Sequence, residues 1–412
     1  MSAARKVDRR SAEGVARADR LIATLAVTVF FEWMGAGAFL PLFPIYLQRH
    51  GSSSTMVGIT MAAFFLAGIV TQYPAGRLAD HWGRREVLMA GQGIYAITTL
   101  GFLFTTAPAA MVALRFLQGV GAGAAEVAAL SVIGAVVAPE RRGRAFGTIY
   151  AAQLTGTIIG PLVGAAFGVQ HMELLFIVTA LVCGAAAIPV LLRPELDAHG
   201  LTTAVQEATP WRLPRAAAGA LLVAAALGLI IGVYDAVWSL LLRNRGAGDV
   251  AINLSWVLFS LPFALTSRPA GRLADRLDRR RLAIGAVLVD CAFCTTYPFV
   301  RSVPVLLVLG ALEATVIALA LPSAQSLLTE HVAEAHQGRV QGLYATSQTA
   351  ATALSAGLAG VLFARASWLP FVAMAAAAGC CALAMIPIWS SVAGHVRHGD
   401  GASEPAPIPG SS

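Results

Sequence analysis

The sequence predicts an all-α integral membrane protein with twelve transmembrane helices, arranged as two six-helix bundles related by pseudo-two-fold symmetry. Of its 412 residues, 57% are hydrophobic and only 12% are charged, whereas about a quarter of the residues in a soluble domain are charged. Twelve apolar runs approach or exceed the roughly 20 residues that cross a bilayer as a helix. The heptapeptide PAGRLAD also occurs twice, at residues 74–80 and 269–275.

The twelve runs and the polar segments around them divide the chain. We expect spans at 21–47, 54–76, 86–106, 108–136, 144–169, 172–192, 216–242, 250–270, 282–301, 304–328, 339–364 and 368–391. The domains are then a cytoplasmic N-terminal tail (1–20), a first bundle (21–192), a cytoplasmic linker (193–215), a second bundle (216–391) and a C-terminal tail (392–412). The last segment is rich in Gly, Pro and Ser, which predicts disorder.

The basic residues predict the orientation in the membrane. If both termini are cytoplasmic, 22 of the 29 Lys and Arg residues fall in cytoplasmic segments and five in external loops. Such a bias predicts a multi-pass protein of the cell membrane with both termini in the cytoplasm. The net charge of +7 therefore reflects topology, and we expect no nucleic-acid partner.

The repeated heptapeptide belongs to a longer internal duplication. The same offset of 195 residues relates Gly143-Arg144 to Gly338-Arg339, and Gln153 to Gln348. It holds from the second to the fifth span of each half, which indicates six helices duplicated in parallel orientation.

The duplicated stretch resembles a motif of a known family. GRLADHWGRR (76–85) is similar to the loop between helices 2 and 3 of the major facilitator superfamily, and GRLADRLDRR is a partial second copy with Asp278 at the usual glycine. Glycine permits a tight exit, arginines anchor at headgroups, and Asp80 can pair with a cation or a helix N-terminus. The resemblance implies a gating contact that locks one conformation. The candidate gating residues are Gly76, Asp80, Arg84, Arg85, Gly271, Asp275 and Arg279; the alternative is a plain positive-inside loop.

Two further motifs resemble those of particular members of this family. Arg115-x-x-Gln118-Gly119-x-Gly121 is similar to a signature of proton-coupled members. The span 144–169 resembles the antiporter motif of drug:proton exporters, with Ala165 in place of its last glycine. The residues that match are Gly147, Gly156, Gly160, Pro161 and Gly164. Three of these glycines recur every four residues, so close helix packing alone is the alternative explanation.

Acidic residues inside the apolar spans are the main functional signal. Each charged group at mid-membrane costs about 2.5–3.5 kcal/mol on insertion scales, yet five acids fall within predicted spans: Glu32, Glu126, Asp235, Asp290 and Glu313. The resemblance implies that the first, fourth, seventh and tenth spans line a central cavity, and four of the five acids lie on them. Desolvation favours the uncharged form of a carboxyl group, so these four are candidate proton carriers.

The candidate coupling and substrate site therefore combines Glu32, Glu126, Asp235 and Glu313 with Arg115. Glu126 lies eleven residues after Arg115 on the same helix face, so a purely structural pairing is the alternative for this acid. Asp290 lies on a span expected to be peripheral, where pairing with a neighbouring polar group is the preferred interpretation. Candidate wall residues of the cavity, for which core packing is the alternative, are Trp33, Gln118, Tyr150, Gln153, Tyr234, Trp238, Tyr344 and Gln348.

These observations predict a secondary active transporter that exports small lipophilic compounds, cationic ones among them, in exchange for protons by alternating access. The alternative is a proton-coupled symporter that imports a sugar or another small metabolite. The expected partners are a small-molecule substrate, protons and the lipid bilayer, with the monomer as the functional unit. The chain has no GxSxG, no P-loop and no His/Glu metal spacing, so we expect no enzyme activity, no cofactor and no metal.

Overall fold

The computed structural model describes residues 2–193, 213–330 and 332–399, and these residues form helices connected by short turns, with no strand among them. The helices of the first half are α1 (Ser2–Phe39), α2 (Phe43–Arg49), α3 (Ser54–Trp82), α4 (Arg84–Gly101), α5 (Pro108–Val136), α6 (Pro139–Phe167) and α7 (Met172–Leu191). Those of the second half are α8 (Arg215–Val233), α9 (Ser239–Asn244), α10 (Asp249–Arg276), α11 (Arg279–Thr296), α12 (Val303–Thr329), α13 (Glu334–Arg365) and α14 (Leu369–Gly399).

Four short helical turns join these helices or interrupt them. They are η1 (Leu40–Leu42), η2 (Val169–His171), the π-helical turn η4 (Tyr234–Trp238) and η5 (Tyr297–Phe299). The first of them begins the break in the first span at Pro41 and Pro44, so that α1 and α2 are separate helices. The third lies inside the seventh predicted span and joins α8 to α9.

Eleven helical segments of the described chain are long and apolar enough to cross a membrane. The predicted span without a counterpart among them is 86–106, which corresponds to α4. This helix has 18 residues, and its first turn carries Arg84, Arg85 and Glu86, so its apolar part is shorter than that of the other spans. It nevertheless packs along α5 and α7 in the interior of the first half.

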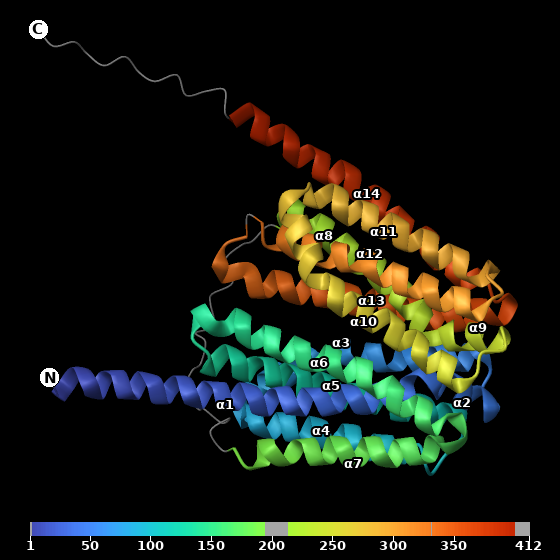
Figure 1. The fold of residues 1–412 in the computed structure, drawn as a ribbon, viewed down its shortest axis with the longest axis horizontal. Helices are drawn as coiled ribbons and strands as arrows, with labels where there is room; N and C mark the ends of the chain where they lie inside the picture. Colours follow the sequence, from blue (N-terminus) through green and yellow to red (C-terminus); the bar gives the residue numbers. More distant parts are fainter. Residues whose placement is uncertain (1, 194–212, 331, 400–412) are drawn as a thin grey trace, which may run out of the picture.

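The helices form two groups that follow the chain (Figure 1). In the first half, α1 packs against α6 and α7, and α5 packs against α3 and α4; in the second half, α8 packs against α13 and α14, and α12 packs against α10 and α11. The halves meet mainly through α3 with α13 and through α6 with α10. Four helices therefore form the boundary across which the two halves can move.

Glycines allow equivalent helix pairs to approach closely in both halves. A Cβ atom on Gly156 of α6 would lie 2.7 Å from the carbonyl oxygen of Phe30 in α1. In the second half, a Cβ atom on Gly232 of α8 would lie 2.8 Å from the backbone nitrogen of Ala356 in α13. The small-residue stripe predicted on the fifth span is thus a packing seam between α6 and α1. In the second half the equivalent pair is α13 and α8, and there the closely packed glycines lie on α8.

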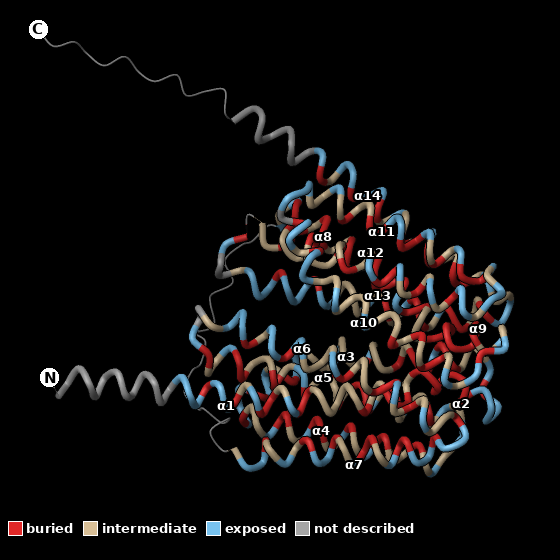
Figure 2. The backbone as a smooth tube through the Cα atoms, viewed as in Figure 1, coloured by how far each residue is buried: buried red, intermediate tan, exposed pale blue. Residues whose placement is uncertain are grey.

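The two ends of the molecule differ in how the halves meet. We call the end that carries the first residues of α1 and the last residues of α14 the tail face, and the other end the opposite face (Figure 1). At the opposite face, a Cβ atom on Gly58 of α3 would lie 2.8 Å from the Cα atom of Gly360 in α13. The backbone N–H of Val169 also donates to Asp249 Oδ2 across the boundary (2.7 Å). Figure 2 shows buried residues gathered where the halves meet at this end.

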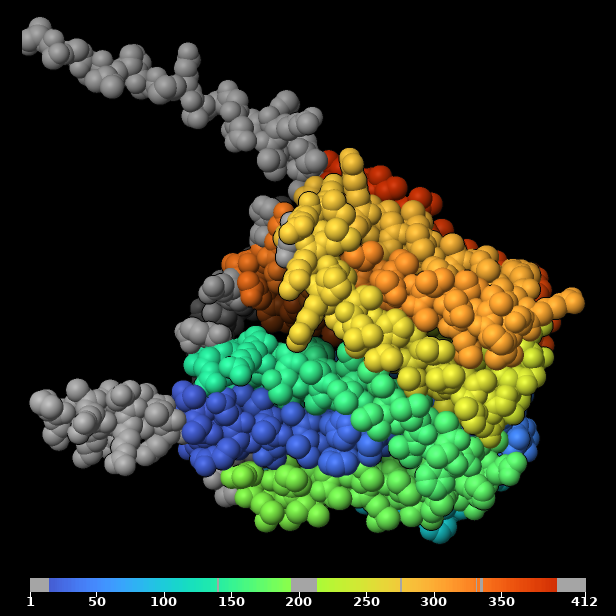
Figure 3. Space-filling view, viewed as in Figure 1, coloured from blue at the N-terminus to red at the C-terminus, as the bar shows by residue number. Residues whose placement is uncertain are grey.

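Toward the tail face, the same boundary helices leave large side chains uncovered. Tyr73 of α3 is 74% exposed, Tyr150 of α6 is 63% exposed and Leu265 of α10 is 70% exposed. The space-filling view shows a hollow between the two halves on this side, with α13 visible in its depth (Figure 3). The structure is therefore closed at the opposite face and open toward the tail face.

The duplicated basic stretches form turns of different construction. Gly76 lies inside α3 and not at its exit, so the prediction that this glycine permits the turn is wrong; the turn is made by Gly83, whose φ is +116°. At the equivalent turn Asp278 has a φ of −65°, and its side chain caps α11 by accepting from the backbone N–H of Arg280 (2.9 Å). A capping carboxylate thus replaces a left-handed glycine.

Two arginines at equivalent positions of these stretches make the same kind of contact. Arg85 donates to the carbonyl oxygens of Val190 (3.2 Å) and Leu191 (2.5 Å) at the end of α7. Arg280 donates to the carbonyl oxygen of Trp389 in α14 (3.2 Å). Each arginine therefore ties the turn to the last helix of its own half, a contact that the gating interpretation of Arg85 did not include.

We expect Arg85→Ala to lower the free energy of unfolding by about 1.5–3 kcal/mol, because charge-assisted hydrogen bonds to helix-end carbonyls are lost. The matched control is Arg281→Ala, since Arg281 is 88% exposed and only faces Asp278, an arrangement that contributes little. Thermal unfolding of both variants in detergent micelles checks this. Equal melting temperatures of the two variants would contradict the anchoring role.

The predicted tails and linker are described in part. The segment 1–20, expected to be a separate tail, is helical from Ser2 and continuous with α1. The last helix α14 runs to Gly399, beyond residue 391, where the disordered tail was expected to begin. Residues 400–412 and most of the predicted linker (194–212) lie outside the described residues.

Candidate functional site

Arg115 lies in the interior of the first half, surrounded by neutral groups. It is 1% exposed on α5, and its guanidinium carbon lies 4.2 Å from the centre of the Phe64 ring. One guanidinium nitrogen donates to Gln118 Oε1, and Gln118 Nε2 donates to the Thr99 hydroxyl (2.7 Å). The contacts of the arginine are thus one amide and aromatic faces, which keeps its positive charge uncompensated by an adjacent carboxylate.

Glu126 does not pair with Arg115. Eleven residues of helix separate the two by about 16 Å along the axis, so sharing a face does not bring them into contact. Glu126 is exposed, and it interacts electrostatically with Glu32 and lies close enough to Tyr150 to affect it. The structural-pairing alternative for Glu126 is therefore wrong, and this acid is exposed in the neighbourhood of Glu32 and Tyr150.

Glu32 is half-buried on α1 and is held by a neighbour on α4. Gln92 Nε2 donates to Glu32 Oε2 (2.6 Å), while Gln92 itself is buried. Gln92 is a functional neighbour that the sequence reasoning missed; its signal was a polar side chain inside the predicted span 86–106. The first half thus contributes one oriented acid, one open acid and one buried cation.

In the second half, the π-helical turn η4 carries Tyr234, Asp235 and Trp238. Asp235 is half-buried and interacts electrostatically with Arg115 of the first half. Single π-helical turns inside helices occur frequently at functional sites. No pattern in the sequence indicated this turn.

Glu313 of α12 faces away from the open space and into an aromatic cluster. The Tyr234 hydroxyl donates to Glu313 Oε1 (2.6 Å), and the Tyr297 hydroxyl donates to Oε2 (2.5 Å). Glu313 and Tyr297 are both 1% exposed. Tyr297 also packs edge-on against Trp238, with ring centres 4.9 Å apart. Tyr297 was absent from the predicted site because it lies at the end of a span, outside the helical spacing used to select wall residues.

Asp290 of α11 is brought to Glu313. Its carboxyl is 1% exposed and interacts directly with that of Glu313. Asp290 was expected to pair with a neighbouring polar group, and the group beside it is the carboxyl of Glu313. This acid was omitted from the predicted site because its span was assigned to the periphery.

The predicted wall residues separate into two groups. Tyr150 is exposed, and Gln153 and Gln348 are half-buried on the boundary helices α6 and α13. Others belong to the hydrophobic packing: Trp33 packs against the core of the first half, and Trp238 and Tyr344 are buried in the larger core. For these three aromatic residues core packing is the observed arrangement, although the buried Tyr344 hydroxyl has no hydrogen-bond partner in the described part of the chain.

The predicted gating residues lie at the tail face and make few contacts across the boundary. Asp80 is largely exposed and lies 3.9 Å from Arg84 on its own half. Gly271 is inside α10 with open space around it, and Arg279 begins α11. The side chain of Asp275 lies outside the described ones. With the tail face open, no inter-half contact of Asp80 is present among the described residues.

Most residues of the antiporter-like motif lie where α6 packs against neighbouring helices. Gly160 faces Gly37 of α1, and a Cβ on Gly164 would lie 2.8 Å from Asn253 Oδ1 in α10. Pro161 lies within α6 beside Gly37. Gly147 has open space around it and is not part of the seam. The motif thus allows α6 to pack closely against α1 and against α10 of the other half.

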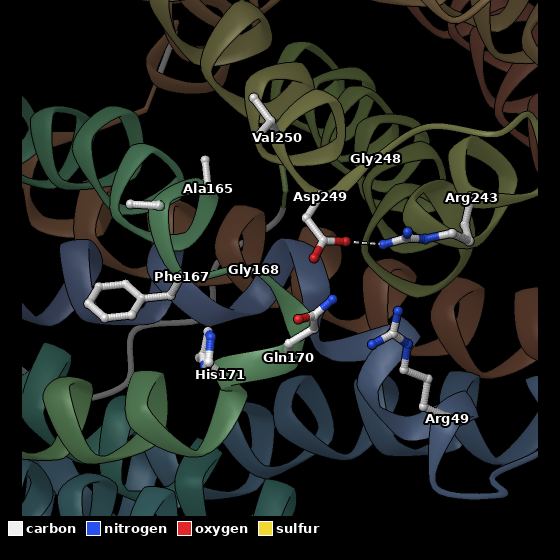
Figure 4. A pocket seen from close by; sticks show the side chains of 11 residues that line it. Arg49, Ala165, Phe167, Gly168, Gln170, His171, Arg243, Gly248, Asp249 and Val250 are labelled. Carbon is white, nitrogen blue, oxygen red and sulfur yellow. Dashed lines mark hydrogen bonds and ion pairs between the residues drawn. The ribbon is translucent and has the colours of Figure 1, made fainter.

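A pocket of about 510 Å³ lies at the opposite face, where residues of both halves meet. Figure 4 shows Asp249 paired with Arg243, with Arg49 and His171 nearby. None of the predicted site residues lines this pocket. Gly164 of α6 precedes the lining residue Ala165 in the chain. In the described ranges, no group of three or more His, Cys, Asp or Glu side chains is arranged to hold a metal ion.

Comparison with known proteins agrees with this architecture. A family model described as Major Facilitator Superfamily matches residues 25–242 and 216–410.

The chain belongs to the major facilitator superfamily.

Its relatives include proteins named for drug resistance. This superfamily member is 26% identical to multidrug resistance protein 2 of Bacillus subtilis (strain 168), over 82% of this chain and 88% of the relative. It is 27% identical to the class E tetracycline resistance protein of Escherichia coli, over 82% of this chain and 86% of that protein. These relatives confirm the resemblance to the drug exporters of the superfamily.

A solved structure shares the fold. The inward-facing, unoccupied form of a bacterial homologue of the human lysosomal transporter Spinster superposes with a TM-score of 0.77, at 12% identity, over 91% of this chain and 98% of that one. Together with the apolar helices, family membership makes this chain a multi-pass membrane transporter for small molecules. Members of the superfamily typically work as monomers, as expected here.

Proposed function

We propose that this transporter exports small lipophilic compounds, cationic ones among them, in exchange for protons by alternating access. The observation that supports this most directly is the distribution of charge between the halves. In the first half, Glu126 is exposed and interacts electrostatically with the half-buried Glu32. In the second half, Asp235 is half-buried and interacts electrostatically with the buried Arg115 of the first half. The names of the relatives, a multidrug and a tetracycline resistance protein, support export.

The chemistry of exchange follows from competition for carboxylates. A proton or a cationic substrate neutralises an acid such as Glu126, and either one makes the loaded site less costly to enclose in a poorly hydrated interior. Gln92 holds Glu32 in one orientation by its amide hydrogen bond. Arg115 supplies a fixed positive charge that interacts electrostatically with Asp235 of the other half. Binding of one ligand then favours release of the other.

The full architecture is part of the same proposal. We take α4 as the twelfth span, so that α1 to α7 and α8 to α14 form two six-helix bundles in the cell membrane. The excess of basic residues on the tail face supports a cytoplasmic location for that face. The conformation described above is then inward-facing, and export requires the tail face to close and the opposite face to open.

The test uses inside-out membrane vesicles with an acidic interior that is reported by a pH-sensitive dye. We expect a lipophilic cation to trigger proton efflux from vesicles that contain the protein, and Glu32→Gln vesicles to show much less. Neutral antibiotics and sugars are added in parallel. Proton efflux triggered by a sugar alone would contradict export and support the proton-coupled symporter.

A further inference from the structure

Glu313 is held as a hydrogen-bond acceptor. Each of its two carboxyl oxygens receives a phenolic hydroxyl, from Tyr234 on one side and Tyr297 on the other. Donors on both oxygens favour the ionised form of a carboxyl group, and each oxygen retains a further lone pair. Glu313 is therefore arranged to accept one more hydrogen bond.

Asp290 interacts with Glu313, and no other side chain described in the structure forms a hydrogen bond with its carboxyl group. Both Asp290 oxygens are buried and make no hydrogen bond of ordinary geometry within the described ranges, although the carboxyl interacts directly with that of Glu313. A buried carboxylate without a donor is very costly, whereas a protonated carboxyl needs only one acceptor. The carboxyl group of Glu313 is the neighbour that can serve as this acceptor.

We propose that Asp290 and Glu313 form a proton-binding site of the second half, in which the two carboxyl groups hold one proton between them and Tyr234 and Tyr297 close the site. Two adjacent carboxyl groups in a buried site do not both ionise readily, because like charges repel in a poorly hydrated interior. The pair then has one negative charge, which the two phenols stabilise.

In the part of the chain that the structure describes, no positively charged side chain lies beside the pair to replace the proton. The titratable side chains that interact with it are Tyr234, Tyr297, Cys291 and Cys294. None of them is positively charged. Among the described residues, no Lys, Arg or His forms an ion pair with either acid. Metal binding is equally unsupported by the described side chains.

Tyr234 is the least buried of the four side chains that form the site. Asp290, Glu313 and Tyr297 are each 1% exposed, whereas Tyr234 is half-buried. Tyr234 belongs to η4, the same π-helical turn that places the next residue, Asp235, toward Arg115. The Tyr234 hydroxyl is therefore the group through which a proton would pass between the pair and the central space.

The occupancy of the pair rests on the burial of both acids and on the hydrogen bonds that hold Glu313, while its use in transport rests on the proposed function. In that use, the second half carries a proton of its own, apart from the acids Glu32 and Glu126. Loss of that proton requires Tyr234 to turn away from Glu313, and this ties proton release to a rearrangement of η4.

The experiment measures the pair directly by infrared spectroscopy of the purified full-length protein in lipid nanodiscs. We expect a carbonyl-stretch band of a protonated carboxyl group at neutral pH that exchanges slowly in deuterium oxide. Asp290→Asn and Glu313→Gln should each remove this band or shift its frequency. The matched control Glu126→Gln, which neutralises an exposed acid, should leave it unchanged.

Two conservative variants keep the test decisive if an acid substitution prevents folding. Tyr297→Phe and Tyr234→Phe retain both acids and should shift the band, because each removes a hydrogen bond to Glu313. Absence of the band from the folded wild-type protein, or a band that responds to Glu126→Gln but not to Asp290→Asn, would overturn the proposal. Failure of the proposed function is separate, since it appears as missing cation-triggered proton efflux with the band still present.

Discussion

Gly58→Leu is expected to abolish transport and to move the protein out of the state described here. A Cβ atom at this position would lie 2.6 Å from the carbonyl oxygen of Ala356 and 2.8 Å from the Cα atom of Gly360. Both are backbone atoms, which cannot yield as the end of a flexible side chain can. A leucine therefore separates α3 from α13 at the opposite face, and the closed arrangement of that face is lost.

The shift is measured by labelling Tyr73→Cys with a membrane-impermeant thiol reagent, in a background without native cysteines. Tyr73 is exposed on the tail side of the same helix, so labelling from the tail face should slow down when Gly58→Leu is added. Gly58→Ala should give a smaller effect. The matched control is Gly68→Ala, because a Cβ there meets nothing within 4 Å. Unchanged labelling in Gly58→Leu would contradict closure by this contact.

Simultaneous Glu32→Gln and Glu313→Gln is expected to reduce proton-driven export to the level of vesicles without the protein. Each half then lacks the carboxyl group that its hydrogen bonds hold in place, by Gln92 in one half and by Tyr234 and Tyr297 in the other. An amide cannot release a proton in the relevant pH range, so a proton gradient no longer drives substrate movement. Uptake of a labelled cation against a gradient is the measurement.

Substrate counterflow, which needs no proton gradient, separates coupling from general damage. We expect it to persist in the double variant, because Arg115, Glu126 and Asp235 remain. Glu173→Gln serves as control, since Glu173 is an exposed acid in the first turn of α7. Wild-type rates of gradient-driven export in the double variant would remove both acids from the proton-carrier assignment.

Much of the fold could be predicted because the membrane imposes a strong pattern on sequence. Long apolar runs and basic clusters locate the helices and the tail face, and the repeat of PAGRLAD pairs the halves. The exact role of each repeated residue was not predictable in this way. The tight turn required a left-handed residue at Gly83, not at Gly76, and Asp278 met the same requirement by capping α11.

The candidate site was predictable only where the arrangement of side chains follows from their spacing along a single helix. The acids were visible as charged residues in apolar runs, and Arg115 with Gln118 followed from their spacing on one helix. Contacts between helices had no local signal. The pairing of Asp290 with Glu313 depends on how α11 packs against α12, and the burial of Trp33 depends on the core of the first half.

The π-helical turn η4 changes the angular phase of the helix that contains it. One additional residue in a helical path rotates every later side chain by about 100° relative to an uninterrupted α-helix. Residues before Tyr234, such as Gly228 and Gly232, are aligned to meet α13, whereas Trp238 at the end of the turn is aligned to meet Ser255 of α10. The seventh span therefore serves two neighbouring helices with two separate faces, and a single helical wheel drawn through residues 216–242 misplaces one of them.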